Sequence, residues 1–259
     1  MPALRVGGEE AMNDLILGNP LKLSDRGDKV KLVQEWLCLR GVLVKIDGDF
    51  GPATDAAVRR FQHSNGLLVD GLVGNNTFTE LIRPMARAMA PIQAVPGLTS
   101  LGSLVTAYAQ QHLEQGPREV GGQNRGPWVR LYMEGNEGDA WAWCAGFAMY
   151  IMKQACRSLS LPLPIQPSFS CDELARRADK AGLLVSEIAA QKLGMLKRGS
   201  LFLVRRSATD WVHTGIVTEV GEGSFETIEG NTNDEGSREG YEVCARVRGF
   251  KDMDFIIWR

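Results

Sequence analysis

The chain has 259 residues, 44% of them hydrophobic and 23% charged, and its formal net charge is −2. This composition is typical of a globular protein with one large domain or two smaller ones, and it excludes collagen-like and disordered classes. The chain has no run of about 20 apolar residues and neither half is polycationic, so we expect neither membrane insertion nor a nucleic-acid partner.

Residues 21–83 predict a small helical domain that contains an internal repeat. Asp47–Thr54 and Asp70–Thr77 share the pattern Asp-Gly-x-φ-Gly-x-x-Thr, where φ is apolar, at an offset of 23 residues. In each copy the Asp-Gly pair predicts a tight turn, and the threonine is expected to cap the helix that follows. Amphipathic spacing over residues 32–39 predicts a further helix. We therefore expect a three-helix domain joined by glycine turns.

Four motifs follow one another through this segment: Arg26-Gly-Asp-Lys-Val-Lys-Leu-Val-Gln, Asp47-Gly-Asp-Phe-Gly-Pro-Ala-Thr, Ala57-Val-Arg-Arg-Phe-Gln and Gly66-Leu-Leu-Val-Asp-Gly-Leu-Val-Gly-Asn-Asn-Thr-Phe. In this order they resemble the peptidoglycan-binding domain of bacterial and phage cell-wall hydrolases. The resemblance implies anchoring to the wall polymer, so peptidoglycan is the expected partner. Most matched positions are turn or core residues, so the resemblance does not identify the side chains that touch the ligand.

Residues 84–103 contain three prolines and are predicted to be a linker, with a short helix at residues 85–89. The second domain is predicted at residues 104–259, with Ser103 as the N-cap of its first helix. Its helices are expected at residues 104–114, 142–158 and 171–181. Five β-rich runs follow, at residues 200–205, 212–218, 224–230, 243–248 and 255–258. Helices packed on an antiparallel sheet give an α+β fold.

The cysteines are odd in number and widely spaced, at Cys38, Cys144, Cys156, Cys171 and Cys244. No Cys-x-x-Cys pair occurs and the chain has only three histidines, so we expect no structural zinc site, no disulfide scaffold and no cofactor. The acidic run at residues 134–139 lacks the alternating Asp pattern of a Ca²⁺ loop, which favours a solvated loop. Reduced thiols are the default, and one of them could be a nucleophile.

Cys144 falls in the first turn of a predicted helix, where unpaired N–H groups and the positive end of the helix dipole favour a thiolate. Taken alone it is equally a small core residue, which is how we interpret the other cysteines. His213 lies in an alternating strand pattern. Glu229 and Asn231 are two apart in an extended segment, so both are expected to point to the same side. A thiol, an imidazole and a carboxylate or amide in this arrangement suit acyl transfer, provided that the sulfur and the imidazole meet in an open groove.

Five motifs occur in order across residues 105–258: Gly121-Gly-Gln-Asn-Arg-Gly-Pro127, Trp143-Cys-Ala-Gly-Phe147, Leu196-Lys-Arg-Gly-Ser-Leu201, His213-Thr-Gly-Ile-Val217 and Ile228-Glu-Gly-Asn-Thr232. They resemble the CHAP domain (cysteine- and histidine-dependent amidohydrolase/peptidase) of papain-like cell-wall hydrolases. The resemblance implies that Cys144 is the nucleophile and His213 the general base and later acid. It implies that Glu229 or Asn231 orients His213, and that choice stays open. Candidate substrate-binding residues are Gln123, Asn124 and Trp143, although glycine turns explain the first two equally well. His112 is predicted to lie on the surface or between domains.

Because both resemblances point to the same polymer, the leading hypothesis is a peptidoglycan hydrolase that cleaves amide bonds in the wall peptide, as an N-acetylmuramoyl-L-alanine amidase or an endopeptidase. The alternatives are a non-catalytic wall-binding protein and a thiol amidase with a small substrate. No signal peptide is recognisable at the N-terminus. We therefore expect synthesis in the cytoplasm and action on the wall in the periplasm or outside the cell. Export would occur by phage lysis, or through secretion machinery paired with an immunity protein.

Overall fold

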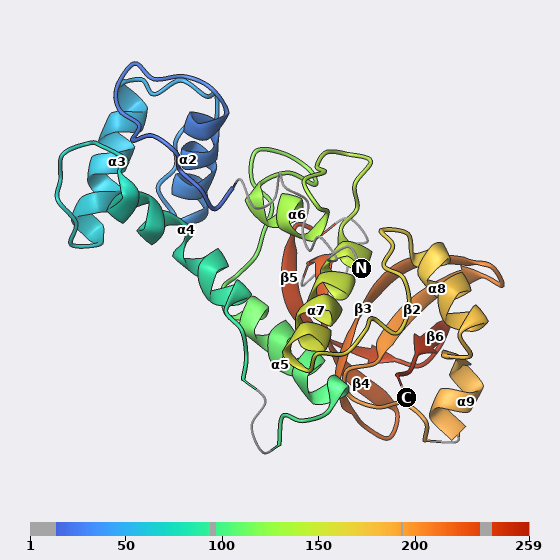
Figure 1. The fold of residues 1–259 in the computed structure, drawn as a ribbon. Helices are drawn as coiled ribbons and strands as arrows, with labels where there is room; N and C mark the ends of the chain where they lie inside the picture. Colours follow the sequence, from blue (N-terminus) through green and yellow to red (C-terminus); the bar gives the residue numbers. More distant parts are fainter. Residues whose placement is uncertain (1–13, 94–96, 193, 234–239, 259) are drawn as a thin grey trace, which may run out of the picture. The chain divides into compact units, whose positions relative to one another are not determined.

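The computed structural model describes residues 14–93, 97–192, 194–233 and 240–258 (Figure 1). The N-terminal residues searched for a signal peptide and residues 94–96 of the predicted linker lie outside this range. The chain forms two compact units. The first unit comprises the chain up to Arg87 together with Arg118–Ala140, and the second comprises Ala88–Pro117 and Trp141–Arg259. The structure therefore draws the boundary differently from the sequence prediction, because residues 118–140 of the predicted catalytic domain belong to the first unit.

The first unit contains the predicted helices of residues 21–83. They are α2 (Asp28–Leu39), α3 (Pro52–Ser64) and the start of α4 (Asn75–Met89), and a shorter helix, α6 (Pro127–Tyr132), comes from the later segment. Helix α4 continues through Pro84, so the short helix predicted at residues 85–89 is the end of α4 and not a separate element. Residues 84–89 of the predicted linker are therefore helical.

Each copy of the internal repeat folds around a buried glutamine, Gln34 in the first and Gln62 in the second. The two side-chain amides make matching hydrogen bonds: Gln34 Nε2 donates to Asp47 Oδ1 (2.9 Å) and Thr54 Oγ1 (3.1 Å), and Gln62 Nε2 donates to Asp70 Oδ1 (2.8 Å) and Thr77 Oγ1 (3.2 Å). The carbonyl oxygens of the same amides accept backbone N–H groups of the Asp-Gly turns. In each copy of the repeat, a buried glutamine amide therefore uses both its N–H donors and its carbonyl oxygen to hold the Asp-Gly turn.

The expectation that Thr54 caps the following helix is wrong. The N-cap of α3 is Gly51 and Pro52 occupies the first helical turn, where its missing N–H carries no penalty. The Thr54 hydroxyl instead accepts from Gln34 and donates to the carbonyl of Asp49 (3.2 Å).

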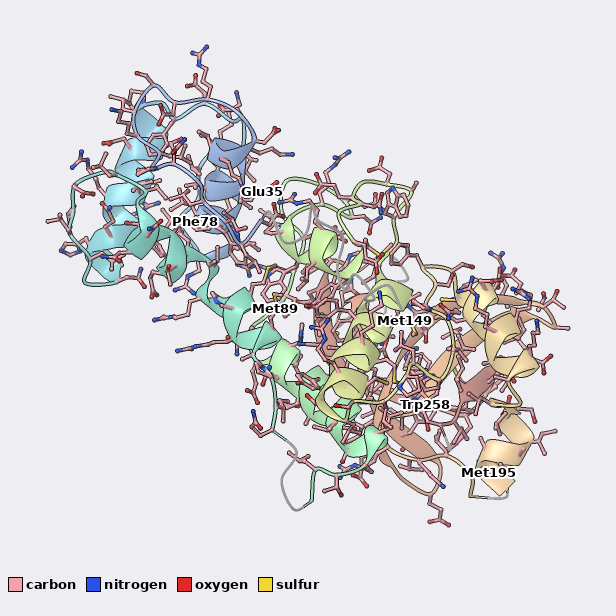
Figure 2. All side chains as sticks on the ribbon, in the orientation of Figure 1. Glu35, Phe78, Met89, Met149, Met195 and Trp258 are labelled. Atoms are coloured by element: carbon pink, nitrogen blue, oxygen red, sulfur yellow. The ribbon has the colours of Figure 1, made fainter. Side chains whose placement is uncertain are left out.

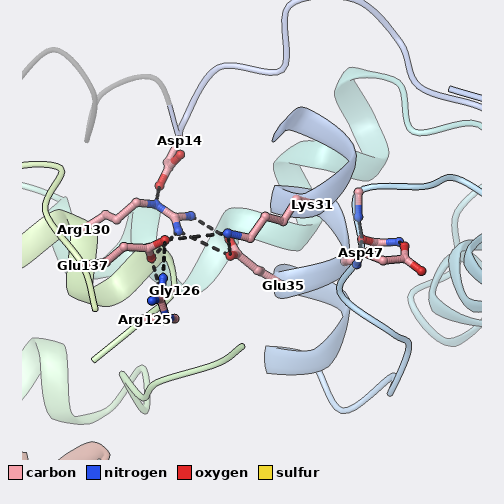
Figure 3. A network of polar contacts seen from close by, with 10 residues as sticks. Asp14, Lys31, Glu35, Asp47, Arg125, Gly126, Arg130 and Glu137 are labelled. Carbon is pink, nitrogen blue, oxygen red and sulfur yellow. Dashed lines mark hydrogen bonds and ion pairs between the residues drawn. The ribbon is translucent and has the colours of Figure 1, made fainter. Parts of the chain in front are cut away.

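A buried arginine explains why residues 118–140 belong to the first unit. Arg130 on α6 contacts three carboxylates, at 2.6 Å from Asp14, 2.7 Å from Glu35 on α2 and 2.8 Å from Glu137 (Figure 3). Glu137 comes from the acidic run for which a solvated loop was predicted, and it also accepts the N–H of Gly126 (2.8 Å). These charged hydrogen bonds fasten the later segment to the helical domain.

The second unit is an α+β fold, as the sequence predicts. Its helices are α5 (Leu101–Leu113), α7 (Cys144–Ser158), α8 (Cys171–Lys180) and α9 (Glu187–Lys192). Its strands are β1 (Leu184–Ser186), β2 (Leu201–Ser207), β3 (Asp210–Val220), β4 (Ser224–Thr232), β5 (Glu242–Gly249) and β6 (Met253–Ile256). They form one antiparallel sheet in the order β1-β6-β2-β3-β4-β5. Over the described residues, no helix has the length and apolarity needed to cross a membrane.

Helix α5 differs from the sequence prediction at both ends. Its N-cap is Ser100 and not Ser103, because the Ser100 hydroxyl accepts the Ser103 N–H (3.1 Å) in a reciprocal capping box. Near its C-terminal end His112 is fully buried, with Nε2 2.9 Å from Gln154 Oε1 on α7, so the predicted surface position is wrong.

Helix α7 packs on strands β3 and β4, and Met149 on this helix is buried (Figure 2). The closest approach is at Gly230 on β4, where an added Cβ would lie 2.7 Å from the Phe147 Cβ and 2.9 Å from the Trp143 ring. A separate apolar cluster joins the strands to α9 and consists of Ala190, Leu196, Phe202, Val217, Phe225, Phe250, Met253, Phe255 and Ile257. This packing fixes the N-terminal end of α7 against β3 and β4.

Candidate active site

The candidate nucleophile, Cys144, is the first residue of α7, as its helical spacing predicts. The His213 ring and the backbone N–H of Thr214, both from β3, act on its sulfur and lower the pKa of the Cys144 thiol. A second sulfur, that of Cys171 at the start of α8, lies 3.9 Å away. Cys144 is 6% exposed. Three elements therefore converge on this one thiol.

A side chain from β4 holds the residue before the nucleophile. Asn231 Oδ1 accepts the backbone N–H of Trp143 at 2.6 Å, and Asn231 Nδ2 donates to the carbonyl of Gly240 at 3.1 Å. Asn231 has a φ of 55°, in the left-handed region that asparagine tolerates better than most residues. The amide thus fixes the entry of the chain into α7.

His213 connects the thiol to a carboxylate. Its Nε2 lies 2.8 Å from Glu229 Oε2, which leaves Nδ1 as the ring nitrogen available to the sulfur. The ring also packs at 5.9 Å from the Phe202 ring, centroid to centroid. His213 is 4% exposed. Its imidazole therefore lies in the protein interior, with the Glu229 carboxylate at Nε2 and the Cys144 sulfur as its other polar neighbour.

Glu229 is completely buried and fully hydrogen-bonded. Arg248 on β5 binds both carboxylate oxygens, at 2.5 Å for Nε and 2.6 Å for Nη2, and Thr227 Oγ1 donates at 2.6 Å. Gly215 leaves the space for this carboxylate, because a Cβ there would lie 2.8 Å from the Glu229 Cγ. A charged pair of this geometry compensates for the desolvation of the buried carboxylate.

The three groups shift one another's pKa values in a consistent direction. A hydrogen bond from Cys171, together with the hydrogen bond and charge of His213, brings the pKa of Cys144 well below its usual range, although burial acts the other way. Burial lowers the pKa of His213, but Cys144 and Glu229 outweigh it and raise the value to about 9. Burial raises the pKa of Glu229, but Arg248 and His213 bring it to about 2. These shifts favour a thiolate at Cys144, an imidazolium at His213 and a carboxylate at Glu229.

The structure brings Cys144, His213 and Glu229 into one hydrogen-bonded series. Of the two candidate residues on β4, Glu229 contacts the His213 imidazole, whereas Asn231 accepts the backbone N–H of Trp143. The expectation that they point to the same side assumed regular alternation, but the β4–β5 ladder shifts register between Glu229 and Thr232. The expected open groove is not found at the sulfur, since both Cys144 and His213 are nearly buried.

The candidate substrate-binding residues are divided between the two units. In the second unit, Trp143 is fully buried, with its ring against Gly230. Gln123 and Asn124 belong to the first unit. There Gln123 is exposed, whereas Asn124 is 3% exposed and donates to the carbonyl of Asp139 (3.4 Å).

Sequence reasoning missed Arg248, Thr227 and Cys171. Arg248 and Arg246 alternate along β5, and two arginines in a strand of the sheet signal that a carboxylate partner exists. Thr227 is two residues before Glu229, the spacing that puts strand side chains on one face. Cys171 was interpreted as a core residue, and nothing in its local pattern indicates that it contacts Cys144.

The second unit contains a cavity of about 1110 Å³ whose lining includes none of Cys144, Cys171 and His213. Its lining includes Ser170 and Asp172, which flank Cys171, and Trp211, two residues before His213. Trp211 is held by Asp172 Oδ1, which accepts its N–H at 2.6 Å, and by Asp254 Oδ2, which accepts its ring N–H at 2.9 Å. Among the described residues there is no group of three or more His, Cys, Asp or Glu that could hold a metal ion.

Comparison with known proteins finds a family match within the first unit. Residues 26–81 match the family described as a putative peptidoglycan binding domain, which confirms the resemblance seen in the sequence. The chain is 54% identical over 41 residues to the zinc D-Ala-D-Ala carboxypeptidase of Streptomyces albus G. It is 39% identical over 74 residues to an uncharacterized protein in the bpoA1 3'region of Kitasatospora aureofaciens. These matches cover 16% and 28% of this chain, and 16% and 63% of the respective relatives.

Two solved structures are also similar. The SleB N-terminal domain is 36% identical, and the match covers 25% of this chain and 90% of that one, with a TM-score of 0.25. The endolysin of Burkholderia AP3 phage is 29% identical, and the match covers 37% of this chain and 36% of that one, with a TM-score of 0.25. The chain therefore contains a segment that matches a putative peptidoglycan binding domain.

Proposed function

We propose that this protein is a peptidoglycan hydrolase in which residues 21–83 hold the wall and a papain-like, CHAP-type domain in the second unit cleaves an amide bond of the wall peptide. The observation that carries the proposal is the buried series Cys144–His213–Glu229, with its thiolate and imidazolium. A thiolate paired with an imidazolium is the reactive form of a cysteine nucleophile. The family match at residues 26–81 supports peptidoglycan as the polymer.

In the proposed reaction the Cys144 sulfur attacks the amide carbonyl carbon, and the carbonyl oxygen becomes an oxyanion. Backbone N–H groups in the first turn of α7 are suited to stabilise it, because they have no partner within the helix. The C–N bond then breaks, and the amine leaves with the proton of the His213 imidazolium. Neutral His213 next takes a proton from water, which attacks the thioester and releases the acid and the thiolate.

The surrounding residues divide the remaining work. Glu229 stabilises the imidazolium and fixes the ring through Nε2. Arg248 is a positioning residue, because it binds the carboxylate and keeps it ionised. Asn231 is also a positioning residue and acts on the chain before Cys144. In our proposal, Glu229 and not Asn231 orients the imidazole.

We further propose that the wall peptide binds in the cavity lined by Trp211 and Asp172, which are close in sequence to His213 and Cys171. Either an N-acetylmuramoyl-L-alanine amidase or an endopeptidase would use the same nucleophile, because bond choice depends on how the cavity holds the peptide. Mass spectrometry of digested muropeptides identifies the bond. The site of action is then the wall, in the periplasm or outside the cell, reached by phage lysis or through secretion machinery with a matching immunity protein.

The direct test compares Cys144→Ala with Cys156→Ala, which also removes one buried sulfur from α7. Purified sacculi are incubated with each protein, and released amino groups and bound protein are both measured. We expect Cys144→Ala to bind sacculi normally and release nothing, whereas Cys156→Ala does both. Release of amino groups by Cys144→Ala at the rate of the unchanged protein would refute the mechanism.

The burial of Cys144 favours a second candidate, a wall-binding protein without catalytic activity. Reaction with iodoacetamide at about pH 6.5 separates the two, since an activated thiolate is alkylated quickly at a pH where an ordinary thiol is not. A thiol amidase with a small substrate would be alkylated as quickly, but it would turn over small amides and leave sacculi intact.

A further inference from the structure

We propose that Cys144 and Cys171 are an oxidation site: a peroxide converts them into a reversible disulfide that switches the enzyme off. That the disulfide silences hydrolysis rests on the function proposed above, whereas formation of the bond rests on the two thiols alone. Peptidoglycan lies outside the reducing cytoplasm, so an enzyme that acts on it works where thiols meet oxidants.

The geometry brings the two sulfurs together from separate helices. Cys144 and Cys171 are the first residues of α7 and α8, and their Sγ atoms are 3.9 Å apart. A disulfide has a length of about 2.05 Å, so the sulfurs must approach by about 1.9 Å, which is within the reach of side-chain rotation. Both residues are nearly buried, at 6% and 7% exposure, which admits a small oxidant more readily than a protein.

The two thiols have unequal acidities, as the two steps of such a reaction require. The contact with Cys171 and the charge of His213 keep Cys144 as the thiolate, with a pKa well below its usual range. The same contact and burial raise the pKa of Cys171, which stays a protonated thiol. The thiolate is the form that attacks a peroxide, so Cys144 is oxidised first and Cys171 responds.

The chemistry balances with one peroxide. The Cys144 thiolate attacks one oxygen of hydrogen peroxide, the O–O bond breaks, hydroxide leaves and Cys144 becomes a sulfenic acid. The Cys171 sulfur then attacks the Cys144 sulfur and displaces the hydroxyl, which leaves as water with the Cys171 proton. Two sulfurs are oxidised by one step each to form the disulfide, and the peroxide is reduced to water and hydroxide. A dithiol such as dithiothreitol reverses the bond by thiol–disulfide exchange.

Two other cysteines, Cys156 and Cys38, have different partners. Cys156 on α7 contacts the sulfur of Met152 at 3.8 Å, and Cys38 donates to the carbonyl of Val44 at 3.2 Å. Burial raises the pKa of Cys156 to about 11, so it does not compete as a thiolate. Oxidation is therefore directed to one pair, and Cys156 provides a matched control.

The test is a peptide map of the full chain after treatment with hydrogen peroxide, without reduction. Trypsin places the cysteines on separate peptides: residues 131–153 contain Cys144, residues 154–157 contain Cys156 and residues 158–176 contain Cys171. We expect peptides 131–153 and 158–176 to appear joined, lighter by two hydrogen atoms than their sum, and to separate after dithiothreitol. Absence of this joined species in oxidised protein would overturn the proposal.

Variants test what Cys171 does. Cys171→Ser retains a polar side chain but removes the second sulfur, so peroxide should carry Cys144 on to the sulfinic acid, which dithiothreitol does not reverse. Oxidised wild type and Cys156→Ser should regain full hydrolysis after dithiothreitol, whereas Cys171→Ser should not. Equal recovery of Cys171→Ser would overturn the proposal. Reduced wild type that forms the joined peptide but never hydrolyses sacculi would refute the proposed function and leave the oxidation site standing.

Discussion

His213 Nε2 lies 2.8 Å from Glu229 Oε2, and the carboxylate that it meets is also bound on both oxygens by Arg248. One buried carboxylate thus serves two cationic groups of different kinds. Arg248 keeps the carboxylate ionised over the whole working range, and the ionised carboxylate favours the imidazolium. The protonation state of the site therefore depends on a guanidinium that touches neither the thiol nor the imidazole ring in this series.

The pH dependence of hydrolysis should reveal the imidazolium. With the pKa of His213 raised to about 9, the proton needed by the leaving amine is present at neutral pH and is lost as the pH rises through 9. We expect kcat/KM on soluble muropeptides to fall on the alkaline side near pH 9. In Glu229→Gln the charge that favours the imidazolium is removed, so this fall should move to lower pH by about one unit or more, with a loss of rate of about 100-fold.

Asn231→Gly provides the contrast to Glu229→Gln. Glycine accepts the φ of 55° without strain, so the variant loses only the amide that binds the Trp143 N–H. We expect the alkaline fall to stay near pH 9 while the free energy of unfolding decreases by about 1–3 kcal/mol, because a buried N–H is left without its acceptor. A shift of the alkaline fall in Asn231→Gly would instead indicate that Asn231 orients the imidazole.

Arg248→Gln should destabilise the second unit most strongly at neutral pH. Glu229 has a folded pKa of about 2 against an ordinary value of 4.5, so its contribution to stability is complete above pH 4.5 and is lost as the pH falls toward 2. Without Arg248, burial raises the folded Glu229 pKa, so this contribution is reduced and less of it remains to be lost in acid. Urea unfolding should show a decrease of about 3 kcal/mol at pH 7 that becomes smaller as the pH falls toward 3. Equal unfolding curves for the variant and wild type from pH 7 to pH 3 would contradict this role.

The sequence could predict what depends on local spacing. The helical pattern after Asp139 puts Cys144 in a first turn, and the alternation around His213 puts it in a strand, and both elements are found. Alternation failed at Asn231, where a left-handed φ and a register shift interrupt the ladder. Contacts between separate elements were also not predicted. Cys171 is 27 residues from Cys144, and the residue pattern within one helix or strand does not indicate such a contact.

The boundary between the two units could not be predicted from the sequence for the same reason. Residues 118–140 belong to the first unit, and the Arg130 side chain reaches Glu35, which is 95 residues away in the chain. Periodicity identifies which face of a helix is apolar, but it does not identify a charged partner on another element. The linker was predicted from the three prolines at residues 84–96, but α4 continues through the first of them, Pro84.

Gly230→Ala should disturb the nucleophile through packing. A Cβ at this position would lie 2.7 Å from the Phe147 Cβ and 2.9 Å from the Trp143 ring, so α7 or β4 must move. We expect a decrease in unfolding free energy of about 1–3 kcal/mol and a loss of hydrolysis larger than the loss of stability explains. Gly223→Ala is the control, because its Cβ meets nothing within 4 Å. Wild-type activity in Gly230→Ala would show that the start of α7 tolerates displacement.

Arg130→Gln should destabilise the first unit most strongly at neutral pH. The variant leaves Asp14, Glu35 and Glu137 close together without their shared cation, at a cost of about 3–5 kcal/mol. Burial already raises the pKa values of Asp14 and Glu35 in the presence of Arg130, and its removal raises them further. The folded variant therefore binds protons more readily than the unfolded chain, so its unfolding free energy should increase as the pH falls from 7 to 5. Urea unfolding at the two pH values measures this, with Arg26→Gln, which breaks an exposed pair with Asp49, as the control. A loss that is equal at both pH values would mean that repulsion among the carboxylates is not its cause.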